Sequence, residues 1–276
     1  MSKEVPPYFD YLIESFRRGG IGRFVHLGYW DRATVTDGFN SGDFESAQQR
    51  LNDLVIELAA VEDGQDVLDV GCGFGGTLAE LNTRLRDVTL VGVNIDSRQL
   101  DICRELKAQN QNSFQWLASD ACQLPLPSAS FDRILCIEAM FHFTSRRNFI
   151  QEAARILRPG GVFVFSDILL SKPLPDQDCP AFLSGSALQD GYGPWPDLWG
   201  SDSNHKELGK VSGLHCVCEI DGTENTLPSH QFTVPSGLDL QRDPIDSSLR
   251  ASMTLRWLHH HGNLKYVFFR FDKPMA

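Results

Sequence analysis

The chain has 276 residues, of which 42% are hydrophobic and 22% charged, and its formal net charge is -11. This balance is typical of a globular protein with one sizeable core, and an acidic surface argues against nucleic acid and anionic membranes as partners. No apolar run approaches the roughly 20 residues that a membrane-spanning helix needs. The N-terminus carries charges where a signal peptide would be apolar, and the seven scattered cysteines fit a reducing compartment, so we expect a cytoplasmic protein.

Along the chain, predicted strands alternate with predicted helices. Apolar residues at three- and four-residue steps predict helices over 6–19 and 44–62. Then follow strands at 66–70, 89–95, 114–118, 131–138 and 161–167, with helices at 77–85, 97–110 and 146–157. Because each parallel crossover needs a helix, the alternation predicts an α/β fold with a mostly parallel sheet and helices on both faces.

After the fifth predicted strand the pattern changes. Residues 171–205 are rich in Pro, Gly, Asp and Trp, and their aromatic content predicts a cap over the site and not a solvated linker. The aromatic residues Tyr192, Trp195, Trp199, Phe141 and Phe143 either line an apolar acceptor site or only pack. The rest of the chain is predicted as helices at 206–213 and 243–262 and strands at 214–220 and 266–271.

The strongest local signal is a buried strand that runs into a glycine-rich turn and then a helix, in the segment VLDVGCGFGG at 67–76. Gly71, Gly73 and Gly75 let the backbone approach a ligand closely. Their spacing differs from the G-x-G-x-x-G of dinucleotide-binding proteins. Asp69 places a carboxylate at the end of the strand, where it can meet a cationic amine, whereas a pyrophosphate would need backbone amides.

This segment resembles motif I of the class I S-adenosylmethionine-dependent methyltransferases, and three further segments follow in the order found in that family. The resemblance implies a Rossmann-like, seven-stranded sheet in the order 3-2-1-4-5-7-6, with the last strand antiparallel and a small cap. It also implies S-adenosyl-L-methionine as the cofactor and S-adenosyl-L-homocysteine as its product, with Asp69, Gly71, Cys72 and Gly73 at the cofactor.

The second segment ends in Asn94, at a position where most of the family carry an acid that binds both ribose hydroxyls. An amide can also bond a hydroxyl, without charge assistance. A neutral residue followed by a glutamine five positions on resembles the tocopherol and cyclopropane-fatty-acid methyltransferases, which implies that Asn94, Ile95 and Gln99 contact the cofactor. Asp96 either caps the following helix or binds the ribose itself.

The third segment, Ser119-Asp120-Ala121, precedes LPLP and SFD and resembles the adenine-binding segment of the family. The resemblance implies that Asp120 accepts a hydrogen bond from the adenine amino group. It also implies that the Ala121 amide donates to the ring and that Ser119 lies beside them. The alternative for Asp120 is a turn or cap residue.

The fourth segment carries the candidate catalytic residues. Ligands of open α/β sheets bind beyond the carboxyl ends of the strands, which brings Glu138, His142 and Asp167 to one rim. EAMFHF and the following SD resemble natural-product O-methyltransferases such as those of erythromycin and rebeccamycin, which implies His142 as general base and Asp167 as its partner. Glu138 either lies at the cofactor and holds the active-site loop or acts as the base, as in terpenoid diphosphate C-methyltransferases.

An aromatic turn near the N-terminus, HLGYW at 26–30, also resembles this subgroup, in which an N-terminal helix and such a turn close over the methionine end of the cofactor. Tyr29 and Trp30 are therefore expected there, with core packing as the alternative, and Tyr8 and Tyr11 are further candidates. Three adjacent histidines at 259–261 point in different directions on a helix and cannot all hold one ion, so no metal site is expected.

The expected organisation has four parts: an N-terminal helical lid (1–43), a cofactor-binding core (44–168), a cap insertion and substrate lid (169–212), and C-terminal strands that complete the core (213–276). The resemblance implies methyl transfer to a hydroxyl of a small secondary metabolite. C- or N-methylation of a ring-bearing or isoprenoid acceptor is one alternative, and a non-catalytic cofactor-binding protein is another. The expected partner is a small-molecule acceptor, and a homodimer remains open.

Overall fold

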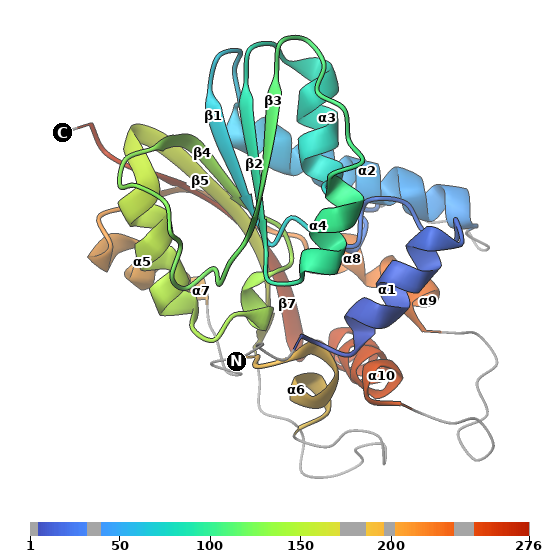
Figure 1. Ribbon diagram of the computed structural model, residues 1–276. Coiled ribbons are helices and arrows are strands. Elements are labelled where there is room, and N and C mark those ends of the chain that lie inside the picture. Colours follow the sequence, from blue (N-terminus) through green and yellow to red (C-terminus); the bar gives the residue numbers. More distant parts are fainter. Residues whose placement is uncertain (1–4, 32–39, 172–185, 196–201, 235–245, 276) are drawn as a thin grey trace, which may run out of the picture.

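The structure is a computed structural model and describes residues 5–31, 40–171, 186–195, 202–234 and 246–275. A seven-stranded sheet in the order β3-β2-β1-β4-β5-β7-β6 forms its centre (Figure 1). Its strands are β1 (Asp66–Val70), β2 (Thr89–Asn94), β3 (Ser113–Ala118), β4 (Phe131–Cys136), β5 (Leu157–Leu170), β6 (His215–Asp221) and β7 (Leu264–Asp272). β1 to β5 pair in parallel, and β7 runs antiparallel to both β5 and β6. The predicted strand order and the antiparallel last strand are confirmed.

The helices follow the predicted positions to within a few residues in most cases. They are α1 (Tyr8–Arg17), α2 (Ser41–Ala59), α3 (Gly76–Arg84), α4 (Ser97–Cys103), α5 (Arg146–Ile156), α6 (Ala187–Tyr192), α7 (Asp202–Val211), α8 (Thr223–Thr226), α9 (His230–Thr233) and α10 (Ser247–His260), with short 3-10 turns η2 (Met140–His142) and η3 (Leu227–Ser229). α4 is shorter than the predicted 97–110. The chain turns after Cys103 and reaches Asn110 and Gln111 at positive φ, which a right-handed helix does not admit.

Helices cover both faces of the sheet. Leu51 and Val55 of α2, Leu81 of α3 and Leu258 of α10 belong to one buried cluster with residues of the strands. On the other face, α5 and α7 pack over the sheet, and α5 buries Phe149 there (Figure 1). β1, β2, β4, β5 and β7 are mostly buried, so they read as nearly continuous apolar runs in the sequence, whereas the edge strands β3 and β6 are largely exposed or half-buried. No helix among the described residues is both long and apolar enough to cross a bilayer.

The expected cap at 169–212 is not one unit in the part of the chain that the structure describes. α6 packs against α10, whereas α7 packs on α5 and β6 as the crossover into β6. The expectation of a single substrate lid was therefore wrong for α7, because its apolar side covers the sheet. Trp199 lies outside the described residues.

Candidate active site

The carboxyl ends of β1, β2, β3 and β4 meet at a cavity of about 350 Å³. Most of the site residues expected from the sequence line it: Asp69, Gly71, Cys72, Gly73, Asn94, Ile95, Gln99, Ser119, Asp120, Ala121, Glu138 and His142. These residues come from four separate loops at one edge of the sheet. The cavity thus lies where open α/β sheets bind their ligands.

The glycine-rich loop after β1 forms the floor of this cavity. Gly71 has φ +79°, and a Cβ on it would lie 2.4 Å from the Cβ of Ala139. A Cβ on Gly73 would lie 2.8 Å from a methyl group of Val25. Glycine is required at both positions, since the N-terminal segment and the loop after β4 pack directly on this backbone.

Asp69 lies at the end of β1 and is 3% exposed. Burial raises the pKa of this carboxyl to about 7. A cationic group in the cavity would favour the ionised form and so bind with Coulombic support. The side chain therefore fits the ammonium group of an amino-acid moiety.

Asn94 and Gln99 form a preassembled amide pair. The Nδ2 of Asn94 donates to the Oε1 of Gln99 at 3.0 Å, which leaves the buried Nε2 of Gln99 without a partner among the described residues. A buried donor without a partner is costly, and hydroxyl oxygens of a ribose can accept from it. Asp96 is instead the N-cap of α4, since its side chain accepts from the Arg98 amide at 2.9 Å.

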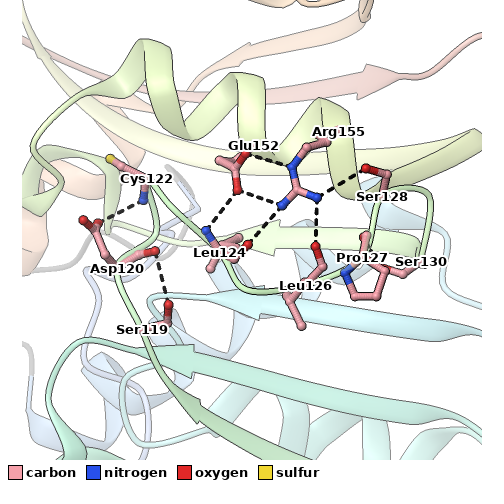
Figure 2. Close-up of polar contacts among 10 residues, drawn as sticks. All are labelled: Ser119, Asp120, Cys122, Leu124, Leu126, Pro127, Ser128, Ser130, Glu152 and Arg155. Carbon is pink, nitrogen blue, oxygen red and sulfur yellow. Dashed lines mark hydrogen bonds and ion pairs between the residues drawn. The ribbon is translucent and has the colours of Figure 1, made fainter.

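The segment after β3 is held in place by α5. Glu152 accepts from the Leu124 amide at 2.9 Å, and Arg155 donates to the carbonyl oxygens of Leu124 and Leu126 (Figure 2). One carboxylate oxygen of Asp120 accepts from the Cys122 amide at 3.0 Å. The turn fixes the direction of Asp120 at the cavity wall before any ligand is present.

After His26, the aromatic turn is anchored away from the cavity. The buried Oγ of Ser229 accepts from the Gly28 amide and from the Nε1 of Trp30, both at 2.9 Å. Tyr29 does not line the cavity, so its expected contact with the cofactor was wrong. Its ring packs beside Phe268, at 6.2 Å between centroids, because its amide is bonded to the Ala47 carbonyl in α2.

The first residue of this turn and the residues just before it occupy the position expected for Tyr29. Phe24, Val25 and His26 line the cavity, with Arg23 beside them. No motif in these residues predicts that they line a site. The glycines of the loop are the one feature that indicates a closely packed neighbour.

Glu138 follows β4 with φ +47°, a conformation that is uncommon for a side chain of this kind. Its Oε1 accepts from the Leu27 amide at 2.8 Å and from the Tyr266 hydroxyl at 2.7 Å. Burial raises the pKa of this carboxyl to about 7, although both hydrogen bonds act to lower it. The contacts favour the first interpretation of Glu138, in which it lies at the cavity and holds the N-terminal segment.

His142 sits in the turn η2 with both ring nitrogens engaged. Its Nδ1 lies 2.5 Å from the Tyr192 carbonyl oxygen, and its Nε2 lies 2.6 Å from the Tyr8 hydroxyl. Because a carbonyl oxygen only accepts, the hydrogen is on Nδ1 and the lone pair is on Nε2. Burial lowers the pKa of the imidazole to about 4, against the opposing effect of the Tyr192 carbonyl.

Asp167 is not the hydrogen-bonding partner of His142. It is fully buried, and it accepts from the Nε of Arg146 at 2.6 Å and from the Nε2 of His205 at 2.9 Å. Burial alone would raise the pKa of Asp167, but Arg146 and His205 outweigh it and lower the pKa to about 2. The expected pairing of Asp167 with His142 was wrong, because Arg146 of α5 and His205 of α7 bind Asp167 instead. No local sequence pattern predicts these two partners.

Two of the aromatic residues of the expected cap pack against the turn that carries His142. Trp195 is 1% exposed and stacks on Phe141 at 4.6 Å between centroids, while the Tyr192 hydroxyl bonds Ser252 at 2.7 Å. Phe143 lines the cavity. Packing is thus the role of Trp195 and Phe141. Among the described residues no group of three or more His, Cys, Asp or Glu could hold a metal ion.

Comparisons with known proteins agree with this arrangement. A family profile described as a methyltransferase domain matches residues 68–165. The chain is 30% identical to the methyltransferase GfsG of Streptomyces halstedii over 85% of this chain and 81% of that protein. It is 32% identical to the erythromycin 3''-O-methyltransferase of Saccharopolyspora erythraea over 59% of this chain and 52% of that protein.

The coverage varies among relatives, and the fold is shared widely. The chain spans between 52% and 65% of the length of three curated relatives that it matches. The solved structure of the mycolic acid cyclopropane synthase CmaA1, complexed with S-adenosylhomocysteine (SAH) and CTAB, superposes with a TM-score of 0.72 at 21% identity, over 98% of this chain and 100% of that one.

Proposed function

Because the chain belongs to the class I S-adenosylmethionine-dependent methyltransferases of natural-product type, we propose that it methylates a hydroxyl group of a small secondary metabolite, with His142 as general base. The observation that carries the proposal is the environment of His142. A backbone carbonyl fixes its hydrogen on Nδ1, so the lone pair is on Nε2, in a ring that lines the cavity. That is the geometry a general base needs.

The residues of the cavity fit the cofactor, which supplies an electrophilic methyl group when bound. Asp69 would hold the ammonium group, and the amide pair of Asn94 and Gln99 would hold the ribose hydroxyls. Asp120 and the Ala121 amide would contact the adenine ring. The low pKa of His142 keeps the imidazole neutral near pH 7, ready to accept a proton.

Glu138 supports the same proposal in a different role. Its carboxylate is engaged by Leu27 and Tyr266, and it holds the N-terminal segment over the glycine loop. C- or N-methylation needs less from His142. The experiment below therefore separates O-methylation from these two alternatives.

The test is the pair His142→Ala and His142→Gln, assayed for S-adenosylhomocysteine formation with a panel of hydroxylated polyketides and glycosides. Loss of a base costs about 10²- to 10⁴-fold in rate, with affinity for SAH unchanged by calorimetry. Turnover within threefold of the wild type in both variants would overturn the role of His142. Binding of SAH without any turnover of any acceptor by the wild type would favour a non-catalytic binder.

A further inference from the structure

The lone pair of the proposed base is already occupied by a residue of the protein itself. The Tyr8 hydroxyl lies 2.6 Å from the Nε2 of His142. Since Nδ1 carries the hydrogen, Tyr8 must be the donor in this bond. The first helix therefore presents a phenol to the base, in the orientation that an acceptor hydroxyl would need.

Aromatic side chains surround the Tyr8 ring as they would surround an aromatic ligand. Its centroid lies 4.9 Å from Tyr192 and 4.9 Å from Phe9, both edge to face, and 5.5 Å from the His142 ring, in a stacked arrangement. Edge-to-face and offset contacts at these distances are the favourable geometries of aromatic pairs. His142, Tyr192 and Phe9 thus form a cage for one flat ring whose hydroxyl reaches Nε2.

An acceptor cannot share this position with Tyr8. An imidazole nitrogen has one lone pair, so Nε2 accepts one strong hydrogen bond at a time. Tyr8 is the first residue of α1, and its N-cap, Pro7, makes no side-chain capping bond. The later turns of α1 are held separately, by packing of Ile13 in the cluster with Phe74 and Ile102. The Tyr8 side chain is only partly buried, so its ring can leave the cage while Phe9 and Ile13 keep the helix docked.

We propose that Tyr8 is a built-in mimic of the acceptor, and that the acceptor is a phenol whose ring replaces that of Tyr8 between His142 and Tyr192. The inference rests on the proposed function and deepens it by naming the class of substrate. In this proposal, the Tyr8 hydroxyl keeps other hydrogen-bond donors away from the Nε2 of His142 until a phenolic acceptor displaces the Tyr8 ring.

The chemistry of the base agrees with a phenolic acceptor. The pKa of His142 is about 4, a phenol has a pKa of about 10, and an aliphatic hydroxyl lies near water, at about 15.7. The pKa difference between the acceptor hydroxyl and His142 is thus about half as large for a phenol as for an aliphatic hydroxyl. In the step, the phenol O–H bond breaks and its proton goes to Nε2. The phenol oxygen bonds the methyl carbon as the carbon–sulfur bond breaks, its electron pair stays on sulfur, and the proton later leaves His142 for water.

The test uses the full chain and two probes that differ only in saturation, 4-methylphenol and 4-methylcyclohexanol. 4-Methylphenol is the tyrosine side chain itself, so Tyr8→Ala should open a cage of its shape. With S-adenosylhomocysteine bound, we expect Tyr8→Ala to bind 4-methylphenol at least tenfold more tightly than the wild type does by calorimetry. With S-adenosylmethionine it should form the methyl ether, and 4-methylcyclohexanol should do neither.

Tyr11→Ala is the matched control, because Tyr11 lies on the same helix but is 67% exposed. It should behave as the wild type. Equal binding of both probes by Tyr8→Ala, or no binding of 4-methylphenol by a variant that still binds S-adenosylhomocysteine, would overturn the proposal. If Tyr8→Ala fails to fold, Tyr8→Phe decides, since it frees Nε2 and keeps the ring. Its KM for phenols should fall several-fold, and an unchanged KM would count against the proposal.

The failure of this inference differs from a failure of the proposed function. If His142-dependent turnover appears with aliphatic hydroxyls and not with phenols, the substrate class is wrong and the base is right. If His142→Ala turns over any acceptor as the wild type does, the base is wrong and the inference falls with it.

Discussion

The carboxylate of Glu138 accepts a hydrogen bond from the backbone amide of Leu27 at 2.8 Å, across 111 residues of chain. The same oxygen accepts from the Tyr266 hydroxyl on β7. One side chain after β4 thereby links the N-terminal segment to β7. This segment packs on the glycine loop, so the tie also determines the shape of the cavity.

Replacing Glu138 by Ala should weaken both folding and cofactor binding. It leaves the Leu27 amide and the Tyr266 hydroxyl without this acceptor, at a cost of about 1–3 kcal/mol. Glu138→Gln keeps an acceptor oxygen and should cost less. Urea unfolding and calorimetry with S-adenosylhomocysteine measure the two effects. Equal loss in both variants would mean that the charge matters and the hydrogen bonds do not.

Affinity for S-adenosylhomocysteine should rise with pH as Asp69 ionises. Burial raises the pKa of this carboxyl to about 7 in the free protein, and an ammonium group favours the ionised form, so binding near neutral pH releases a proton. Between pH 6 and 8 the affinity should increase, and Asp69→Asn should remove most of that rise. Glu138→Gln is the control, because Glu138 also titrates near pH 7. A pH profile that Asp69→Asn leaves unchanged would contradict the role of Asp69.

With saturating S-adenosylmethionine, kcat should fall on the acid side of its pH profile near pH 4 and not near pH 6.5. Burial lowers the pKa of His142 to about 4, and the neutral imidazole is the active form, so activity rises as pH passes through that value. Initial rates between pH 4 and 7, divided by the folded fraction measured at each pH, give the limb. An acid limb near the ordinary histidine value would show that His142 is solvated during turnover.

Arg146→Met should destabilise the protein by about 3–5 kcal/mol. The change leaves Asp167 buried without its cationic partner, which is the costly way to break a buried pair. Asp167→Asn in the same background should recover part of the loss. The folded fraction of Asp167→Asn alone should keep its kcat within about tenfold. A fall near the 10⁴-fold seen when a catalytic His–Asp pair is broken would restore Asp167 as the partner of the base.

Acid should destabilise the fold as the pH falls from about 6.5 toward 4, because three histidines are buried in their neutral form. His26, His230 and His259 are nearly fully buried, and burial lowers the pKa of each, to about 4 for His26 and His259. Their unfolded forms bind protons below about pH 6.5, so the stability they give is complete above that pH and is lost as pH falls toward 4. The loss is about 3 kcal/mol for each fully shifted histidine.

The pair of His230 and His259 gives this prediction a structural basis. His259 donates from Nε2 to the Thr223 carbonyl at 2.7 Å, so its Nδ1 accepts from the Nε2 of His230 at 2.8 Å. A proton on the Nδ1 of His259 would place two N–H groups face to face. The free energy of unfolding, measured in urea between pH 4 and 7, should fall steeply toward acid. A flat profile would contradict the buried, neutral state of these rings.

The strand pattern and most of the residues that line the cavity could be predicted from the chain alone. The alternation of apolar runs with helices predicts parallel pairing, and the glycines after Asp69 predict a close backbone approach, whereas the strand order and the places of Asn94 and Gln99 came from the resemblance to the methyltransferase family. Such features depend on residues a few positions apart, which is the range over which a sequence pattern carries information. The expected sheet order is confirmed, and most of the residues expected at the cofactor line the cavity.

The partners of the individual side chains could not be predicted in this way, because they come from distant parts of the chain. Asp167 meets Arg146 and His205, and His142 meets Tyr8 and Tyr192, across 21 to 134 residues of chain. A carboxylate or an imidazole can be satisfied by any suitable donor or acceptor that packing brings within reach. Spacing along the chain does not encode which one arrives. The partner of the base thus follows from how α1, α5, α6 and α7 dock on the sheet.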